Sequence, residues 1–154
     1  MPSDEPAALP ETAAVDITEA VIADLVRLGG YTHPLFTGTS GQPVPLPGQG
    51  VLLLMGGLVE RSGHLDHAVA LVELRRVRFA KMALPGSTLR VAIEEQDSAT
   101  TSSGKLLTVY RWTALDGSGE TVAEAEAVML VHSKDDIAGQ GVRGDGDQGE
   151  GVVV

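Results

Sequence analysis

The side chains best suited to proton transfer lie in one segment, residues 31–49, of this 154-residue chain. His33 is the obvious proton shuttle there, because an imidazole titrates near pH 6.5. Tyr31 could donate a hydrogen bond, but a phenol with a pKa of about 10 is a poor base at neutral pH. His33 could equally do no more than hydrogen-bond the loop backbone beside Pro34. The segment is therefore a candidate acid–base site with a structural alternative.

Two further histidines, His64 and His67, flank Asp66 in the sequence GHLDH. That spacing could in principle bind a metal ion, since imidazole and carboxylate are both metal ligands. Histidines three residues apart beside a turn are more often solvated. We therefore expect no metal and no cofactor.

A single basic cluster lies in the middle of the chain. On a regular strand, Arg76 and Arg78 would share a face and Arg75 would point the other way. Such a cluster could bind phosphate groups or an acidic protein surface. It could also be an ordinary solvated sheet face. The cluster consists of Arg75, Arg76, Arg78 and Lys81.

Composition excludes several classes of function. The chain has no cysteine, which excludes disulfides, zinc–thiolate sites and thiol nucleophiles. A net charge of −10 with 3 % aromatic residues is unlike nucleic-acid-binding proteins, which need a basic surface and stacking side chains. The sequence contains no run of eighteen uncharged apolar residues and opens with acidic residues and prolines. We expect no membrane segment and a cytoplasmic protein.

The two ends of the chain differ in composition from its centre. Residues 1–12 are acidic and rich in proline, which predicts a disordered leader. Residues 134–154 are rich in glycine and aspartate, which predicts a flexible tail. The remaining residues, 13–133, have the length of one domain.

Helical patterns are confined to the first half of this domain. Residues 18–29 carry a capping residue, apolar positions on one helix face and a terminal Gly29-Gly30, which together predict a helix. Residues 31–48 contain too many prolines and glycines for a regular element, so we expect a loop. Residues 50–60 are apolar nearly all round, which favours a buried helix over a strand. Gly56-Gly57 weakens that helix, so we expect a sheet or a ligand to approach it closely.

Strand patterns fill the second half. Residues 68–80, 87–96, 106–115 and 121–131 alternate with a period of two and are separated by turn residues, which predicts an antiparallel meander. Small residues such as Ala123, Ala125 and Ala127 share one face of the last strand, leaving room for a helix to lie against it. Trp112 and Tyr110 share a side of the third strand, and we expect both in the core. The fold class predicted is α+β.

Three stretches resemble the MaoC-like hydratases and dehydratases, a family with the hot-dog fold, and the resemblance covers about residues 15–132. ITEAVIADLVRLGGYTHPLF resembles that family's first helix and catalytic loop, and PVPLPGQGVLLLMGGLVERSG resembles the start of its long central helix. VRFAKMALPGSTLRVAIEE resembles its strand, proline-glycine turn and strand, and is the most specific of the three. The resemblance implies one antiparallel sheet wrapped around a central helix.

The family uses an Asp and a His on the loop to add water to a 2-enoyl thioester, or to remove it, by general acid–base chemistry. In this chain Tyr31 stands at the Asp position and Phe36 at the His position, so the usual dyad is replaced. His33 occupies the middle position of the motif and becomes the candidate catalytic base. Tyr31 would assist as a hydrogen-bond donor or fill the space that the dyad leaves.

The resemblance also implies a binding site at the start of the central helix. The Gly50 N–H would stabilise the thioester oxygen, because the first N–H groups of a helix are unpaired and lie at the positive end of its dipole. Its glycine neighbours could equally serve only the turn. Arg76 and Arg78 would receive the phosphates of coenzyme A or the acidic surface of an acyl carrier protein. The binding residues expected are Thr32, Gln49, Gly50, Val51, Arg76 and Arg78.

Two functions from different classes follow. The first is an acyl-thioester hydratase or dehydratase with an atypical site formed by His33 and Tyr31. The second is a catalytically silent acyl-binding chain or partner subunit. A hot-dog thioesterase ranks lower, because the candidate carboxylate, Glu60, lies towards the far end of the helix. Since the family joins two sheets edge to edge, we expect a homodimer.

Overall fold

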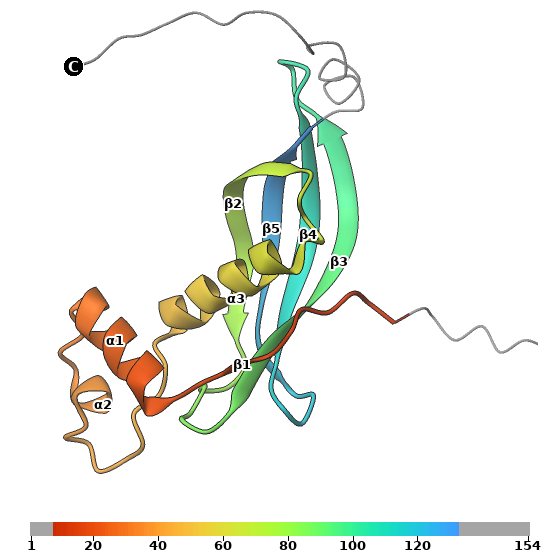
Figure 1. The fold of residues 1–154 in the computed structure, drawn as a ribbon. Helices are drawn as coiled ribbons and strands as arrows, with labels where there is room; N and C mark the ends of the chain where they lie inside the picture. Colours follow the sequence, from red (N-terminus) through yellow and green to blue (C-terminus); the bar gives the residue numbers. More distant parts are fainter. Residues whose placement is uncertain (1–7, 133–154) are drawn as a thin grey trace, which may run out of the picture.

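A computed structural model describes residues 8–132, and apart from a short first strand that the sequence did not predict, its helices precede its strands as expected (Figure 1). None of the helices in this part of the chain is both long enough and apolar enough to cross a membrane. The helices are α1 (Glu19–Gly29), α2 (Pro34–Thr37) and α3 (Gly48–Ser62). The strands are β1 (Val15–Asp16), β2 (Ala68–Phe79), β3 (Thr88–Thr100), β4 (Leu106–Leu115) and β5 (Thr121–Val131).

The strands form one antiparallel sheet in the order β1-β3-β4-β5-β2. Strands β3, β4 and β5 form the expected meander, but β2 pairs with β5 at the opposite edge from β1. The four-strand meander predicted from the sequence is therefore wrong at β2. The connection between β2 and β3 is not a tight hairpin, because its backbone groups form hydrogen bonds with other segments of the chain. Leu46 N donates to Ala83 O (2.8 Å), and Gly86 N donates to Ile17 O (2.8 Å).

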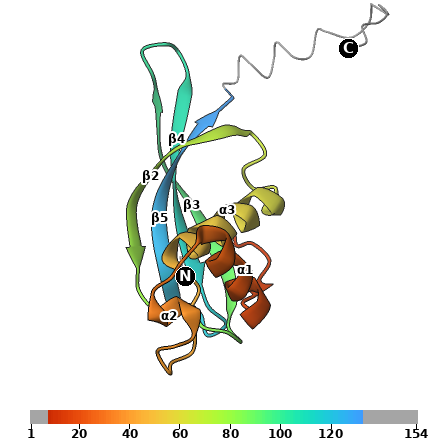
Figure 2. The same ribbon diagram turned by 90° about the vertical axis from the view of Figure 1, so that its left-hand side faces the viewer.

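Helix α3 lies across one face of the curled sheet, with α1 and α2 near its N-terminal end (Figure 2). Met55 of α3 is fully buried and belongs to the same core cluster as Ala123 and Ala127 of β5 and Leu89 and Val91 of β3. Tyr110 and Trp112 are also in this core, as expected. Short alanine side chains let a helix approach the sheet closely. The space between them is then small, so a close-packed core needs few aromatic residues.

The helix ends have local causes. Thr18 Oγ1 accepts a hydrogen bond from Val21 N (3.1 Å) at the start of α1, and Gly30 ends it in a left-handed conformation. Helix α3 begins at Gly48, two residues before the predicted start. Its N-cap, Pro47, makes no side-chain hydrogen bond to the helix. The backbone N–H groups at this end are therefore not capped by that residue.

The predicted leader is partly wrong. Pro10 O accepts from Ile93 N (2.9 Å) and Thr12 N donates to Val91 O (2.9 Å), so these residues extend the pairing along the β3 edge. Thr12 is buried, and its hydroxyl accepts from Val91 N. The backbone groups at an open strand edge are unpaired, and even a polar, proline-rich segment can form hydrogen bonds with them. The rest of the leader, residues 1–7, and the predicted tail lie outside the described residues.

Candidate functional site

A cavity of about 320 Å³ lies at the N-terminal end of α3, and we call it the entry cavity. Gly48 and Val51 of α3 form its floor. Phe79, at the end of β2, packs on the helix start, where a Cβ on Gly48 would lie 3.0 Å from its ring. A larger side chain at residue 48 would therefore displace the Phe79 ring. The remaining walls come from Leu35, Phe36, Pro45, Leu46, Lys81, Met82 and Ala83.

The backbone N–H groups of Gly48, Gln49 and Gly50 precede the first intrahelical hydrogen bond of α3, from Val51 N to Pro47 O (3.0 Å). They lie at the positive end of the helix dipole, where a polarised carbonyl oxygen is stabilised. Gly48 opens onto the entry cavity. Gly50 is buried, and a Cβ there would lie 3.2 Å from both Leu25 and Leu46, so a larger side chain would crowd these two leucines.

Tyr31 and Gln49 lie on another side of the helix start. Tyr31 Oη donates to Gln49 Oε1 (3.0 Å), and the Tyr31 ring packs against Phe36 with centroids 5.0 Å apart. With Gly50, both residues line a smaller cavity of about 170 Å³ between α1 and α3. The structure thus divides the predicted site residues: Val51 lines the entry cavity, whereas Tyr31, Gln49 and Gly50 line its neighbour.

His33 caps the short helix α2, which the sequence did not predict. Its Nδ1 accepts a hydrogen bond from Leu35 N (3.1 Å), and Pro34 occupies the first helical position. His33 and Thr32 are both exposed, and neither lines the two cavities. The backbone hydrogen bond is the structural role that the sequence offered as the alternative to catalysis.

Lys81, which the sequence pattern indicates only as part of the basic cluster, is the ionisable residue in the wall of the entry cavity. Its Nζ forms ion pairs with Asp116 and with Glu120 Oε2 (2.6 Å). The hydrogen bond from Lys81, and then that from the Ser118 hydroxyl, lower the pKa of Asp116 well below its usual range. The same pairing, with Asp116 first, raises the pKa of Lys81. The partners are distant in the sequence, so no spacing signal reveals them.

This cluster predicts acid sensitivity. A carboxyl whose pKa is lowered on folding adds stability above its unfolded pKa of about 3.9, and loses it as the pH falls further. Replacing Lys81 by methionine should therefore flatten the decline in stability between about pH 5 and pH 3. Urea unfolding across that range measures the decline. Arg27→Met is the matched control, because Arg27 pairs with Asp24 at the exposed surface (3.7 Å); an equal flattening there would contradict the assignment.

Arg76 and Arg78, the predicted phosphate-binding residues, do not lie on a regular strand. Strand β2 has a register shift between Arg75 and Arg78, and Arg76 has a positive φ of 49°. Arg76 Nη1 donates to Glu126 Oε1 (3.2 Å), and Arg78 lies opposite Glu124 on β5. Neither arginine lines the entry cavity. Acidic residues of β5 thus face the basic cluster.

Of the two histidines in GHLDH, His67 contacts the sheet through its side chain. His67 Nε2 and Tyr110 Oη are 2.8 Å apart. Burial, followed by the charge of Glu95, raises the pKa of Tyr110. Within residues 8–132 there is no group of three or more acidic or histidine side chains that could hold a metal ion.

Comparison with known proteins identifies the fold. No protein-family model matches the sequence, and no curated protein matches it. Among solved structures, a MaoC-like dehydratase from Rhodospirillum rubrum superposes with a TM-score of 0.70 at 15 % identity, covering 83 % of this chain and 94 % of that one. The (R)-hydratase from A. caviae involved in PHA biosynthesis gives 0.63 at 16 % identity, covering 86 % and 100 %.

A third structure is the C-terminally truncated HadBC (3R-hydroxyacyl-ACP dehydratase) complex from Mycobacterium tuberculosis. It gives a TM-score of 0.64 at 19 % identity and covers 80 % of this chain and 96 % of that one. The chain therefore has the hot-dog fold that its sequence predicted, and its structural neighbours include MaoC-like dehydratases and (R)-hydratases.

Proposed function

We propose that this chain binds an acyl thioester of coenzyme A or a carrier protein in the cytoplasm, as a catalytically silent hot-dog subunit. The observation that carries the proposal is the lining of the entry cavity, which includes Phe36, the residue that the sequence resemblance aligns with the family's histidine. Among the described residues, no histidine or carboxylate lines this cavity. A phenylalanine cannot transfer a proton, so the cavity offers binding without acid–base chemistry.

Several features support binding. The cavity is apolar, as an acyl chain requires, and its volume lies within the range of small-molecule sites. The uncapped start of α3 offers N–H groups to a thioester oxygen. Lys81 is held by two carboxylates, which keeps it charged and limits its use as a base. The neighbouring HadBC complex is named as a 3R-hydroxyacyl-ACP dehydratase, which is consistent with a thioester ligand.

The experiment is a calorimetric titration with an octenoyl thioester of coenzyme A, followed by product analysis of the same samples. The proposal expects saturable binding and no hydrated product. Hydration at an enzymatic rate would overturn the silent assignment, and failure to bind either the coenzyme A or the carrier-protein thioester would overturn the function itself.

A second candidate, a hydratase or dehydratase with His33 as base, is favoured by one observation. The capping hydrogen bond engages only Nδ1, so Nε2 of the exposed imidazole is available for proton transfer. If wild-type protein hydrates the thioester, His33→Ala should abolish turnover and keep binding. His64→Ala, another exposed histidine outside the entry cavity, is the matched control.

We also propose a homodimer joined at the free edge of β2. This strand ends the sheet on one side and is exposed along most of its length, including Val69, Leu71 and Val72. An apolar edge strand invites pairing with another strand. Glu73 and Arg75 lie on either side of Leu74 in the sequence. If β2 paired with its copy in antiparallel fashion, with Leu74 opposite Leu74, Glu73 of each copy would lie opposite Arg75 of the other.

Val72→Lys should therefore weaken self-association by about tenfold or more, because it places a charge in the apolar edge. Val72 is 57 % exposed in the single chain, so the substitution should leave the fold intact. Analytical ultracentrifugation measures the effect. Leu28→Lys on α1, at a residue 76 % exposed, is the control and should leave the association unchanged. Equal effects of the two substitutions would contradict a β2 interface.

A further inference from the structure

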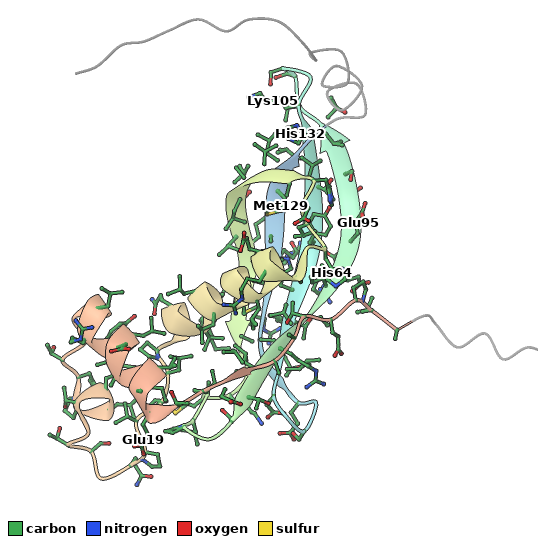
Figure 3. All side chains as sticks on the ribbon, in the orientation of Figure 1. Glu19, His64, Glu95, Lys105, Met129 and His132 are labelled. Carbon is green, nitrogen blue, oxygen red and sulfur yellow. The ribbon has the colours of Figure 1, made fainter. Side chains whose placement is uncertain are left out.

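A second cavity of about 320 Å³, which we call the distal cavity, lies between the C-terminal half of α3 and the start of β2. Met129, labelled in Figure 3, lines the cavity from β5. The residues that matter for its chemistry are Gly56, Glu60, Trp112 and Met129. None of them belongs to the entry cavity.

The helix wall of the distal cavity contains an unexplained glycine. Gly56 and Gly57 lie inside α3, where glycine is a weaker helix former than alanine. A Cβ built on either residue would meet no atom within 4 Å, whereas one on Gly48 or Gly50 would meet a neighbour. The close approach of the sheet that the sequence suggested is therefore absent in the single chain. The space beside Gly56 is open and adjoins the distal cavity.

The sheet wall contains an unsatisfied donor. Trp112 is 5 % exposed, and its Nε1–H has no hydrogen-bond partner among the described residues. A buried N–H without an acceptor is energetically unfavourable, so such groups are rare in native proteins. Met129 lines the same cavity, and a methionine side chain is flexible enough to adjust to a bound ligand.

The carboxylate of Glu60 restricts which acceptor fits. It disfavours an anionic group in the same cavity, and it can itself accept a hydrogen bond. A hydroxyl group suits both residues, because a hydroxyl can accept a hydrogen bond from an indole N–H and donate one to a carboxylate. We propose that the distal cavity binds the hydroxyl-bearing end of an aliphatic chain.

That chain would be the acyl group of the thioester, and this part of the inference rests on the proposed function. Gly48 and Gly56 are eight residues apart on one helix, or about 12 Å along its axis. Both cavities lie between α3 and β2, with Phe79 at one end and Leu71 at the other. The acyl assignment therefore requires a medium-length chain, because the chain must span this distance between α3 and the sheet to reach the distal cavity.

The first test uses probes without a thioester: hexanol, hexanethiol and hexanoate. Trp112 is the only tryptophan of the chain, so its fluorescence reports on this cavity specifically. We expect hexanol to change the emission and to bind about tenfold more tightly than hexanethiol or hexanoate. By calorimetry, Trp112→Phe should reduce that preference to less than about twofold, because it keeps an aromatic ring and removes the donor. Equal binding of the three probes would overturn the proposal.

A matched pair of variants tests the location. Gly56→Leu fills the distal cavity and should abolish hexanol binding, whereas Gly57→Leu places the same side chain outside the cavity and should preserve it. Circular dichroism establishes that both variants are folded. If Gly56→Leu instead dissociates a dimer and leaves hexanol binding unchanged, the open space belongs to a second copy and the proposal is wrong.

Binding experiments with two thioesters distinguish this inference from the proposed function. An octanoyl thioester with a terminal hydroxyl should bind about tenfold more tightly than octanoyl-CoA. Selective hexanol binding without any thioester binding would remove the proposed function and the acyl assignment, leaving only a hydroxyl-binding cavity. Thioester binding with no preference for the hydroxyl would overturn the further inference alone.

Discussion

Replacing Met55 by alanine should lower the free energy of unfolding by about 2–5 kcal/mol, the usual cost of emptying a well-packed core position. Met55 is fully buried at the centre of α3, with the alanines of β5 in the same core. Because those alanines are short, they cannot fill the space that the methionine leaves. Urea unfolding at neutral pH measures the loss.

Leu53→Ala is the matched control for this prediction. Leu53 lies two residues away on the same helix, but it is 59 % exposed. The control substitution should change the free energy of unfolding by no more than about 0.5 kcal/mol. Similar losses for the two variants would mean that α3 does not pack on the sheet through the Met55 face.

Replacing Met82 by glutamate should weaken binding of an octanoyl thioester by about tenfold or more, equivalent to about 1.4 kcal/mol. Met82 lines the entry cavity, where a carboxylate would lose hydration against an apolar chain. Its side chain is 59 % exposed, so the fold should tolerate the charge. Calorimetric titration of folded protein measures the affinity.

Leu84→Glu provides the comparison. Leu84 lies two residues further along the same connection, is 42 % exposed and does not line the entry cavity. The substitution adds the same charge to the same segment, so general repulsion of the ligand's phosphates affects both variants alike. We expect less than about a twofold loss for Leu84→Glu, and equal losses would contradict binding in the entry cavity.

The elements of the fold could be predicted because their signals are local. The cap at Thr18, the glycine at residue 30 and the alternating pattern from Leu106 to Leu115 each depend on neighbouring residues. The position of β2 could not be predicted in this way. It depends on hydrogen bonds that hold the connection between β2 and β3 against Leu46 and Ile17, which are distant in the sequence.

The candidate site was predictable only as a region. Val51 and the start of α3 line the entry cavity, whereas Tyr31 and Gln49 line the smaller neighbouring cavity. His33 became the cap of a one-turn helix that its proline-rich context concealed. Lys81 was missed as a site residue because its partners, Asp116 and Glu120, come from a turn between two later strands.

The most direct test of the central claim uses the four methionines as reporters. Met82 lines the entry cavity, Met129 lines the distal cavity and Met55 lies in the core. Methyl-labelled methionine can be followed by nuclear magnetic resonance while octanoyl-CoA is added. Acyl binding in the entry cavity predicts a saturable shift of the Met82 methyl signal and a much smaller shift for Met55. An unchanged Met82 signal at a ligand concentration that saturates binding would contradict the account.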